Sequence, residues 1–504
     1  MPATFSYQLD TPLYKGGATV QTGLFIDGTF VDGSNHTTID VINPSTGKLI
    51  TQVSEGTAKD VDRAVEAASK AFKNSWGLKV PGSARGQLLY KLATLMEDSL
   101  DDIAAIESLD NGTAFGIVKG WVVPFSIGLL RYYAGWADKI SGQVIETDEG
   151  RLTYTRHEPI GVIVGTKLTI SLYVVLMFAM KIAPALAAGN TVVIKPSELT
   201  PLSALRVCSL VQEAGFPPGV LNVVVGYGNT VGSAISSHMN IDKIAFTGST
   251  LTGRKVMEAA SKSNLKNITL ELGGKSPNII FNDADIDQAV NWACHGIFFA
   301  QGQICFAGSR IYVQSGVYDE FLAKFTARSR AHKIGDPFGA DSYQGPQISS
   351  AQTERIMGYI KTGLDQGAKV HLGGERHGEK DGNFITPTIF TNTTPDMKIV
   401  QEEIFGPVSV IIKFEDQEDV IRQANDTIYG LAAAVFTQNI TQAFEVGHAL
   451  KAGTVWVNCY NEVSAAVPFG GFKQSGIGRE YGSYALEHYV NVKAMHINIG
   501  HRMA

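Results

Sequence analysis

The chain has 504 residues, of which 44% are hydrophobic and 18% are charged, and its formal net charge is −6. This length and composition indicate a folded protein of two or three domains and exclude a disordered chain. The net negative charge excludes the basic footprint of a nucleic-acid-binding protein. The four cysteines lie far apart, in neither a disulfide framework nor a metal-ligand pattern, so we expect reduced thiols, a cytoplasmic location and no metal site.

Two segments bear on targeting and membranes. Residues 1–15 lack the apolar core of a signal peptide and the arginine-rich pattern of an organelle presequence. Residues 168–188 are almost entirely apolar and about long enough to span a membrane. Lys181 and Pro184 interrupt this run, and a strand-like segment follows at once. A buried helix of an α/β domain is therefore favoured over a membrane span.

The predicted elements change in character along the chain. Short strands with turns are expected over residues 24–56, and helical periodicity covers residues 58–110 and 124–137. Residues 142–160 alternate polar and apolar side chains, which predicts a hairpin whose edge suits pairing with another subunit. Strands and helices alternate from 191 to 272, which is typical of a doubly wound parallel sheet. A second α/β pattern follows residue 310, and a last strand at 491–498 is expected to join the hairpin.

Two glycine-rich segments compete for a phosphate-binding role. Residues 226–232 lie between a strand and a helix, but they miss the GxGxxG spacing by one residue, and a plain turn fits them better. Residues 246–253 also join a strand to a helix, and their backbone N–H groups and hydroxyls would suit a pyrophosphate. Residues 195–198 follow another strand, where a nucleotide ribose lies in such sheets.

A carboxylate and a cysteine stand out as a candidate general base and nucleophile. Glu271 ends an apolar run, and Gly273 and Gly274 after it permit tight backbone geometry. Cys305 lies in a polar, glycine-flanked segment that substrate and water can reach. A lone cysteine is most often a buried small hydrophobe and a lone glutamate a surface charge, so the flanking sequences carry this assignment.

The segments at 271–277 (Glu-Leu-Gly-Gly-Lys-Ser-Pro) and 302–310 (Gly-Gln-Ile-Cys-Phe-Ala-Gly-Ser-Arg) closely resemble the catalytic signatures of the aldehyde dehydrogenase superfamily, of the class 1/2 type. The resemblance covers nearly the whole chain. It implies an NAD(P)-dependent enzyme that oxidises a small-molecule aldehyde to a carboxylic acid. Cys305 would attack the aldehyde, and Glu271 would activate the water that hydrolyses the resulting thioester.

The resemblance also implies the cofactor site and the domain plan. The cofactor-binding residues would be Gly248, Ser249 and Gly253 at the pyrophosphate, Lys195 and Glu198 at the adenosine ribose, and Glu403 and Phe405 at the nicotinamide end. A carboxylate at 198 should repel a 2′-phosphate, which favours NAD over NADP. The fold class is α/β. We expect a Rossmann-like NAD-binding domain (1–141 and 161–273), a second α/β catalytic domain (274–480) and an oligomerisation segment (142–160 and 481–504), in a homodimer or homotetramer.

One loop departs from the family pattern. Members of the family stabilise the oxyanion with an asparagine in a Pro-Trp-Asn-Phe-Pro-like loop, but Leu172 stands at that position here, in a segment about two residues longer. Leucine cannot donate a hydrogen bond, and losing one oxyanion donor costs roughly 10²–10³ in turnover. Ala300, where the family often has asparagine, is a smaller departure.

We therefore expect an impaired enzyme. The alternatives are that Thr169 or Ser171 replaces the donor, or that the segment is a sequence artefact in a normal enzyme. Two other functions stay open: a catalytically inactive binding or structural protein with the same fold, and an NAD-independent esterase. Aromatic residues are candidates for an apolar tunnel that would admit aliphatic or aromatic aldehydes: Tyr132, Tyr133, Trp136 and Phe469.

Overall fold

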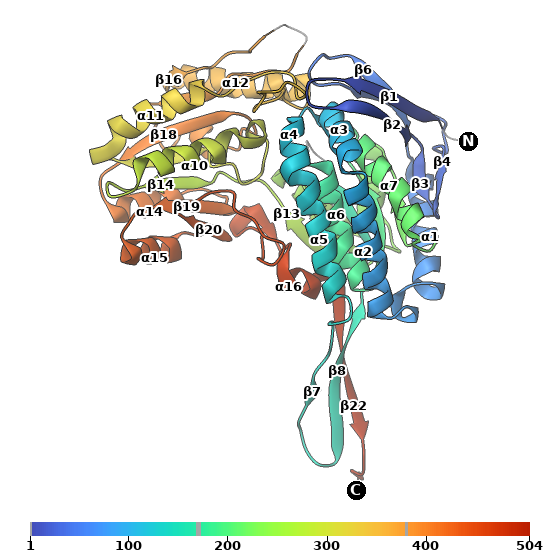
Figure 1. Cartoon of the computed structure of the whole chain (residues 1–504). Helices are drawn as coiled ribbons and strands as arrows, with labels where there is room; N and C mark the ends of the chain where they lie inside the picture. Colours follow the sequence, from blue (N-terminus) through green and yellow to red (C-terminus); the bar gives the residue numbers. More distant parts are fainter. Residues whose placement is uncertain (1–2, 168–172, 379–381, 504) are drawn as a thin grey trace.

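The computed structural model describes residues 3–167, 173–378 and 382–503. Two large sheets and a thin projecting arm organise the molecule (Figure 1). In the first sheet, five neighbouring strands run parallel: β13 (Asn267–Glu271), β12 (Lys243–Thr247), β9 (Val162–Lys167), β10 (Thr191–Lys195) and β11 (Leu221–Val223). Three antiparallel strands complete its edges: β21 (Gly476–Ile477), β3 (Leu24–Ile26) and β4 (Thr29–Val31).

Helices pack against this sheet through continuous apolar faces. In α1 (Ala58–Asn74), Thr57 and Asp60 form a reciprocal capping box at the first turn, and the buried face repeats at helical spacing. Three helices lie side by side in Figure 1: α2 (Gly82–Asp98), α5 (Val123–Trp136) and α6 (Val174–Ala187). Helix α6 is the predicted apolar helix, and it is buried inside the protein. Among the residues described, no helix is long and apolar enough to cross a membrane.

The second sheet carries the later part of the chain. Six of its strands are parallel, in the order β17 (Thr388–Thr391), β18 (Val408–Phe414), β15 (Arg310–Gln314), β14 (Pro277–Ile280), β19 (Ala432–Phe436) and β20 (Thr454–Val457), and β16 (Lys369–Leu372) is antiparallel at one edge. The chain is thus of the predicted α/β class. Strand β21 comes from the predicted catalytic segment yet extends the first sheet, and the domain boundaries stay a prediction.

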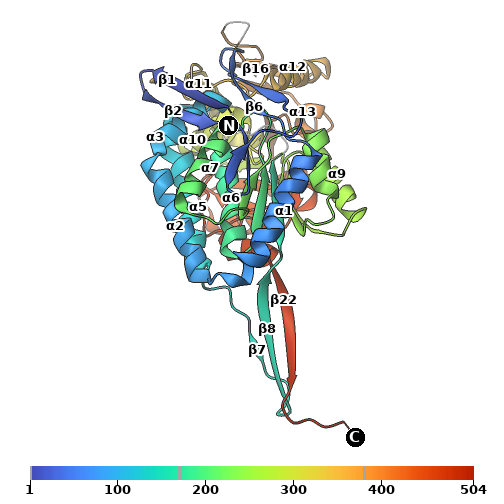
Figure 2. The same cartoon turned by 90° about the vertical axis from the view of Figure 1, so that its right-hand side faces the viewer.

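The predicted hairpin forms the projecting arm. Strand β7 (Val144–Ile145) pairs with β8 (Arg151–Pro159), and the last strand, β22 (Val490–Asn498), pairs with β8 along its whole length. Figures 1 and 2 both show this arm extending from the body with the C-terminus at its far end. Apolar side chains on the arm are exposed, among them Val144 and Val492. The sequence prediction of this sheet is confirmed.

An N-terminal hairpin was not predicted from the sequence. Strand β1 (Thr4–Asp10) pairs with β2 (Lys15–Gln21), and the Tyr7 hydroxyl donates a hydrogen bond to the carbonyl oxygen of Asp102 at 3.2 Å. The period-two alternation of Phe5, Tyr7 and Leu9 was the available signal.

Candidate active site

Glu271 is fixed at the carboxyl end of β13, beside the equivalent end of β12. The register places Thr247 opposite Glu271, and the Gly248 N–H donates to the Glu271 carbonyl oxygen at 3.0 Å. On the other side Glu271 pairs with Gly476, where an added Cβ would lie 2.2 Å from the Leu270 carbonyl oxygen. Strand ends of this kind form the ligand crevice of a parallel sheet.

Cys305 reaches the same place from the second sheet. It lies between η4 (Phe299–Gly302), which follows α10 (Ile286–Phe298), and strand β15. The Tyr460 hydroxyl donates to the carbonyl oxygen of Phe306 at 2.6 Å, next to the cysteine. Gly274 makes room for this loop, because a Cβ there would be 2.4 Å from the Cys305 carbonyl oxygen. The segments 271–277 and 302–310 are therefore packed against each other through backbone atoms.

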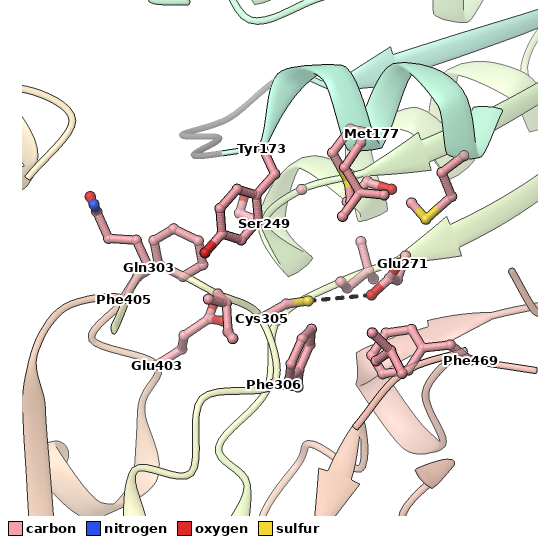
Figure 3. Close-up of a pocket in the computed structure, with 18 of the residues that line it drawn as sticks. Tyr173, Met177, Ser249, Glu271, Gln303, Cys305, Phe306, Glu403, Phe405 and Phe469 are labelled. Carbon is pink, nitrogen blue, oxygen red and sulfur yellow. Dashed lines mark hydrogen bonds between the residues drawn. The ribbon is translucent and has the colours of Figure 1, made fainter. Parts of the chain in front are cut away.

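The structure brings the predicted catalytic pair together. The Cys305 Sγ atom donates a hydrogen bond to Oε1 of Glu271 at 3.3 Å (Figure 3). Glu271 is 5% exposed, whereas Cys305 is half-buried at the cavity wall. A carboxylate at this distance can accept the thiol proton, or act as base toward a water molecule beside the same sulfur.

Glu403 and Phe405 line the same cavity, on the other side of Cys305 from Glu271 in Figure 3. The Gly274 N–H donates to Oε1 of Glu403 at 3.1 Å. Gly273 is needed for this approach, since a Cβ there would lie 2.3 Å from Oε2 of Glu403. Burial raises the pKa of Glu403 to about 7, against the opposing hydrogen bond from Gly274.

The second glycine-rich segment, and not the first, borders this cavity. Gly248 and Ser249 are among its lining residues. Ser249 caps helix α9 (Thr250–Ser261), and its hydroxyl accepts the Thr252 N–H at 3.2 Å. Gly253 has a packing role, because a Cβ there would lie 2.6 Å from Cδ2 of Leu272. Residues 226–232 instead include a short π turn, η3 (Gly228–Gly232), away from the lining residues.

Lys195 and Glu198 lie together at the end of β10. The Lys195 ammonium contacts Oε2 of Glu198 and the Pro196 carbonyl oxygen, at 3.0 and 2.9 Å. Burial lowers the pKa of Lys195, and the Glu198 carboxylate opposes that shift. Lys195 borders a smaller cavity that shares Met177 and Thr247 with the main one. The pair thus lies at a cavity next to the one that Cys305 and Glu271 line.

Several lining residues have no signal in the local sequence. Long-range packing brings them in from separate elements: Trp121, Tyr173, Met177, Gln352, Arg355 and Tyr481. Of the four aromatic candidates for a tunnel, Phe469 lines the cavity, whereas Tyr132, Tyr133 and Trp136 do not. Tyr133 is a core residue whose hydroxyl donates to the Gly482 carbonyl oxygen at 3.0 Å. Leu172, Thr169 and Ser171 lie outside the described residues.

Ala300, the smaller departure from the family pattern, has a strained backbone. Its φ is 55° and that of Gln301 is 57°, so two successive non-glycine residues are left-handed. Asparagine tolerates this conformation better than alanine does. Alanine in place of asparagine at position 300 therefore increases the backbone strain beside the loop that carries Cys305.

Known proteins resemble the chain over nearly its full length. Residues 30–495 match the model of the aldehyde dehydrogenase family. An aldehyde dehydrogenase of Agaricus bisporus is 64% identical over 503 residues, which is 100% of both chains. Human aldehyde dehydrogenase 1A1 is 49% identical over 496 residues, or 98% of each chain. The NAD+ complex of an aldehyde dehydrogenase from Bacillus cereus superposes with a TM-score of 0.93 at 45% identity, covering 95% of this chain and 97% of that one.

The similarity and the active-site geometry agree. The family match spans both sheets and includes Glu271, Cys305 and Glu403, which converge on one cavity. The chain belongs to the aldehyde dehydrogenase family.

Proposed function

We propose that this protein oxidises aldehydes to carboxylic acids with NAD, through a thioester on Cys305. The observation that carries the proposal is the 3.3 Å contact between the Cys305 thiol and the Glu271 carboxylate, both of which line the same cavity as Gly248, Ser249 and Glu403. Glu271 holds the proton that the thiol loses when Cys305 adds to the aldehyde carbon. Glu271 must release that proton to solvent before the next step, and the free carboxylate then takes a proton from the water that cleaves the thioester.

The residues around the cavity fit a dinucleotide. The N-terminus of α9, with Gly248 and Ser249, offers backbone N–H groups to a pyrophosphate. Gly273 leaves room for the Glu403 carboxylate to face the cavity, where it suits ribose hydroxyls. NAD, when bound, supplies the acceptor for the hydride that leaves the substrate carbon. Phe405 would form an apolar wall beside it.

Lys195 and Glu198 support the choice of NAD. Their contact is already formed at the end of β10, so the lysine and the carboxylate can both meet the hydroxyls of an adenosine ribose. The negative charge of Glu198 disfavours a 2′-phosphate at the same place. The solved relatives include NAD+ complexes, among them a betaine aldehyde dehydrogenase of Staphylococcus aureus at 40% identity.

We also propose that turnover is reduced by the altered loop, since Leu172 offers no hydrogen-bond donor to the oxyanion.

The exposed apolar side chains of the arm support a homo-oligomer, because an unpaired sheet with apolar residues favours pairing with another subunit. The four cysteines are all free thiols, which supports a reducing compartment such as the cytoplasm.

Absorbance of NADH in mixtures with acetaldehyde and NAD tests this function, with Cys305→Ala as the comparison. We expect NADH from the parent and none above background from the variant.

A second candidate, ester hydrolysis without NAD, rests on the same thiol–carboxylate pair. Cleavage of an aryl acetate in the absence of NAD, without NADH formation from any aldehyde, would favour that candidate. NAD binding without either reaction would favour a binding protein.

A further inference from the structure

Six aromatic rings form a continuous series of ring contacts, the arc, and five of them line the cavity that holds Cys305 and Glu271. Successive ring centroids lie between 5.3 and 6.3 Å apart. In order along the arc, the rings are Tyr173, Trp121, Phe125, Tyr481, Phe469 and Phe306. The last ring follows Cys305 directly in the chain, and all but Phe125 line the cavity. The arc therefore begins beside helix α6 and ends at the nucleophile.

An irregular helical turn places Trp121 in this arc. Trp121 lies in a π turn, η2 (Val118–Val122), just before α5. Pro124 follows it and has no N–H to give to the carbonyl of Gly120, with which its ring would also clash in a regular helix. The wider turn resolves that conflict, and such turns are frequent at functional sites.

Neighbouring rings hold Trp121 in one orientation. Its ring is parallel to Phe125 within 5°, at 5.6 Å. It meets Tyr173 and Phe299 edge-on, at interplanar angles of 68° and 82°. A ring held on three sides loses little entropy when a ligand packs against it. Burial also raises the pKa of Tyr481 well above its ordinary value, so this member of the arc stays neutral.

The end of the arc is directly beside the reacting atoms. Phe306 and Phe469 meet at 5.3 Å and an angle of 69°, and Figure 3 shows both next to Cys305 and Glu271. An aldehyde whose carbonyl carbon reaches the Cys305 sulfur must place its side chain close to these rings. Aromatic pairs prefer offset or edge-to-face contacts, which a planar aryl group can form and a saturated ring cannot.

We propose that this arc selects aldehydes that carry a planar aryl group, an inference that rests on the aldehyde oxidation proposed above. Trp121 is the specificity-determining residue of the arc. It contacts the aryl group, while Phe125 and Phe299 hold its ring in place.

Two substrates of matched size distinguish the effect of an aromatic ring from the effect of ring size on specificity. Phenylacetaldehyde and cyclohexylacetaldehyde have the same carbon skeleton, and a methylene separates each ring from the carbonyl, so their intrinsic reactivities are similar. We expect kcat/KM to favour phenylacetaldehyde by about tenfold, as two or more aromatic contacts would give. In Trp121→Leu the ratio of the two kcat/KM values should fall to between about 1 and about 3. The matched control is Trp136→Leu, which removes a half-buried tryptophan of α5 outside the cavity and should leave the ratio unchanged.

Binding gives a second readout that does not need turnover. Isothermal titration with the unreactive alcohols 2-phenylethanol and 2-cyclohexylethanol should show the same preference and its loss in Trp121→Leu. NADH formation with neither aldehyde would refute the proposed oxidation, whereas the alcohol titration would still decide on the arc. Equal affinities for the two alcohols, or an equal loss of preference in Trp136→Leu and Trp121→Leu, would overturn this inference.

Discussion

The thiol of Cys305 and the carboxylate of Glu271 meet at 3.3 Å although they come from different parts of the fold. Glu271 ends a strand of the first sheet, and Cys305 lies in a loop that leads into the second. The proposed nucleophile and the proposed base are therefore aligned only when the two sheets pack correctly. Gly274 makes this approach possible, since a Cβ there would lie 2.4 Å from the Cys305 carbonyl oxygen.

Glu271→Gln should lower aldehyde turnover by about 10²–10⁴-fold, the usual contribution of a general base. The amide keeps the size of the side chain but cannot accept the proton of thiol or water. Steady-state NADH formation measures the effect. Glu258→Gln is the control, because Glu258 lies exposed on α9 in an ion pair with Lys262. An unchanged rate in Glu271→Gln would remove Glu271 from the mechanism.

The affinity for NAD should depend on pH through Glu403. Burial raises the pKa of this carboxyl to about 7, so it is largely protonated below that pH and ionised above it. An ionised carboxylate can accept hydrogen bonds from two ribose hydroxyls, whereas a protonated one can accept fewer. The KM for NAD should rise as the pH falls through 7, and Glu403→Gln should flatten this dependence. A dependence that persists in the glutamine variant would place the titrating group elsewhere.

Restoring a Pro-Trp-Asn-Phe-Pro loop before Leu176 should raise turnover by about 10²–10³-fold, because it returns an oxyanion donor. The matched control is the same loop with leucine in place of its asparagine, which should stay at the rate of the parent. Steady-state kcat with acetaldehyde measures both. If the two loops behave alike, the donor does not limit the reaction.

A buried ion pair links α6 to the segment after β21. The Lys181 ammonium contacts the Glu480 carboxylate, and each residue is 5% exposed. Lys181→Met should leave a buried unpaired carboxylate and destabilise the fold by about 3–5 kcal/mol. Thermal unfolding should then show a lower Tm for this variant and a substantial recovery in Lys181→Met/Glu480→Leu. Strictly additive losses would show that the two groups are not coupled.

The sequence predicted the elements that have a regular period and the residues that lie at their ends. Alternating strands and helices indicated the parallel sheet, and its strand ends place Lys195, Ser249 and Glu271 beside two cavities that share Met177 and Thr247. The polar–apolar alternation of residues 142–160 predicted the hairpin of the arm. These signals are local, so one sequence is enough to read them.

Residues that reach the cavity by long-range packing could not be predicted. Trp121 depends on a π turn, and Tyr481 has a φ of 60°, at the start of a short helix. The sequence does not distinguish the aromatic residues of α5 from one another. In the structure Tyr133 is buried in the core, whereas Phe125 stacks on Trp121 of the arc. Only the packing of α5 against its neighbours distinguishes them.

Mass spectrometry of the peptide that contains Cys305 tests the central claim most directly. The protein is mixed with acetaldehyde, with or without NAD, and quenched in acid. We expect an acetyl group on Cys305 only when NAD is present, because an aldehyde becomes a thioester only after it loses a hydride. Acetylation without NAD, or NADH accumulating while Cys305 is never modified, would contradict a covalent oxidation at this cysteine.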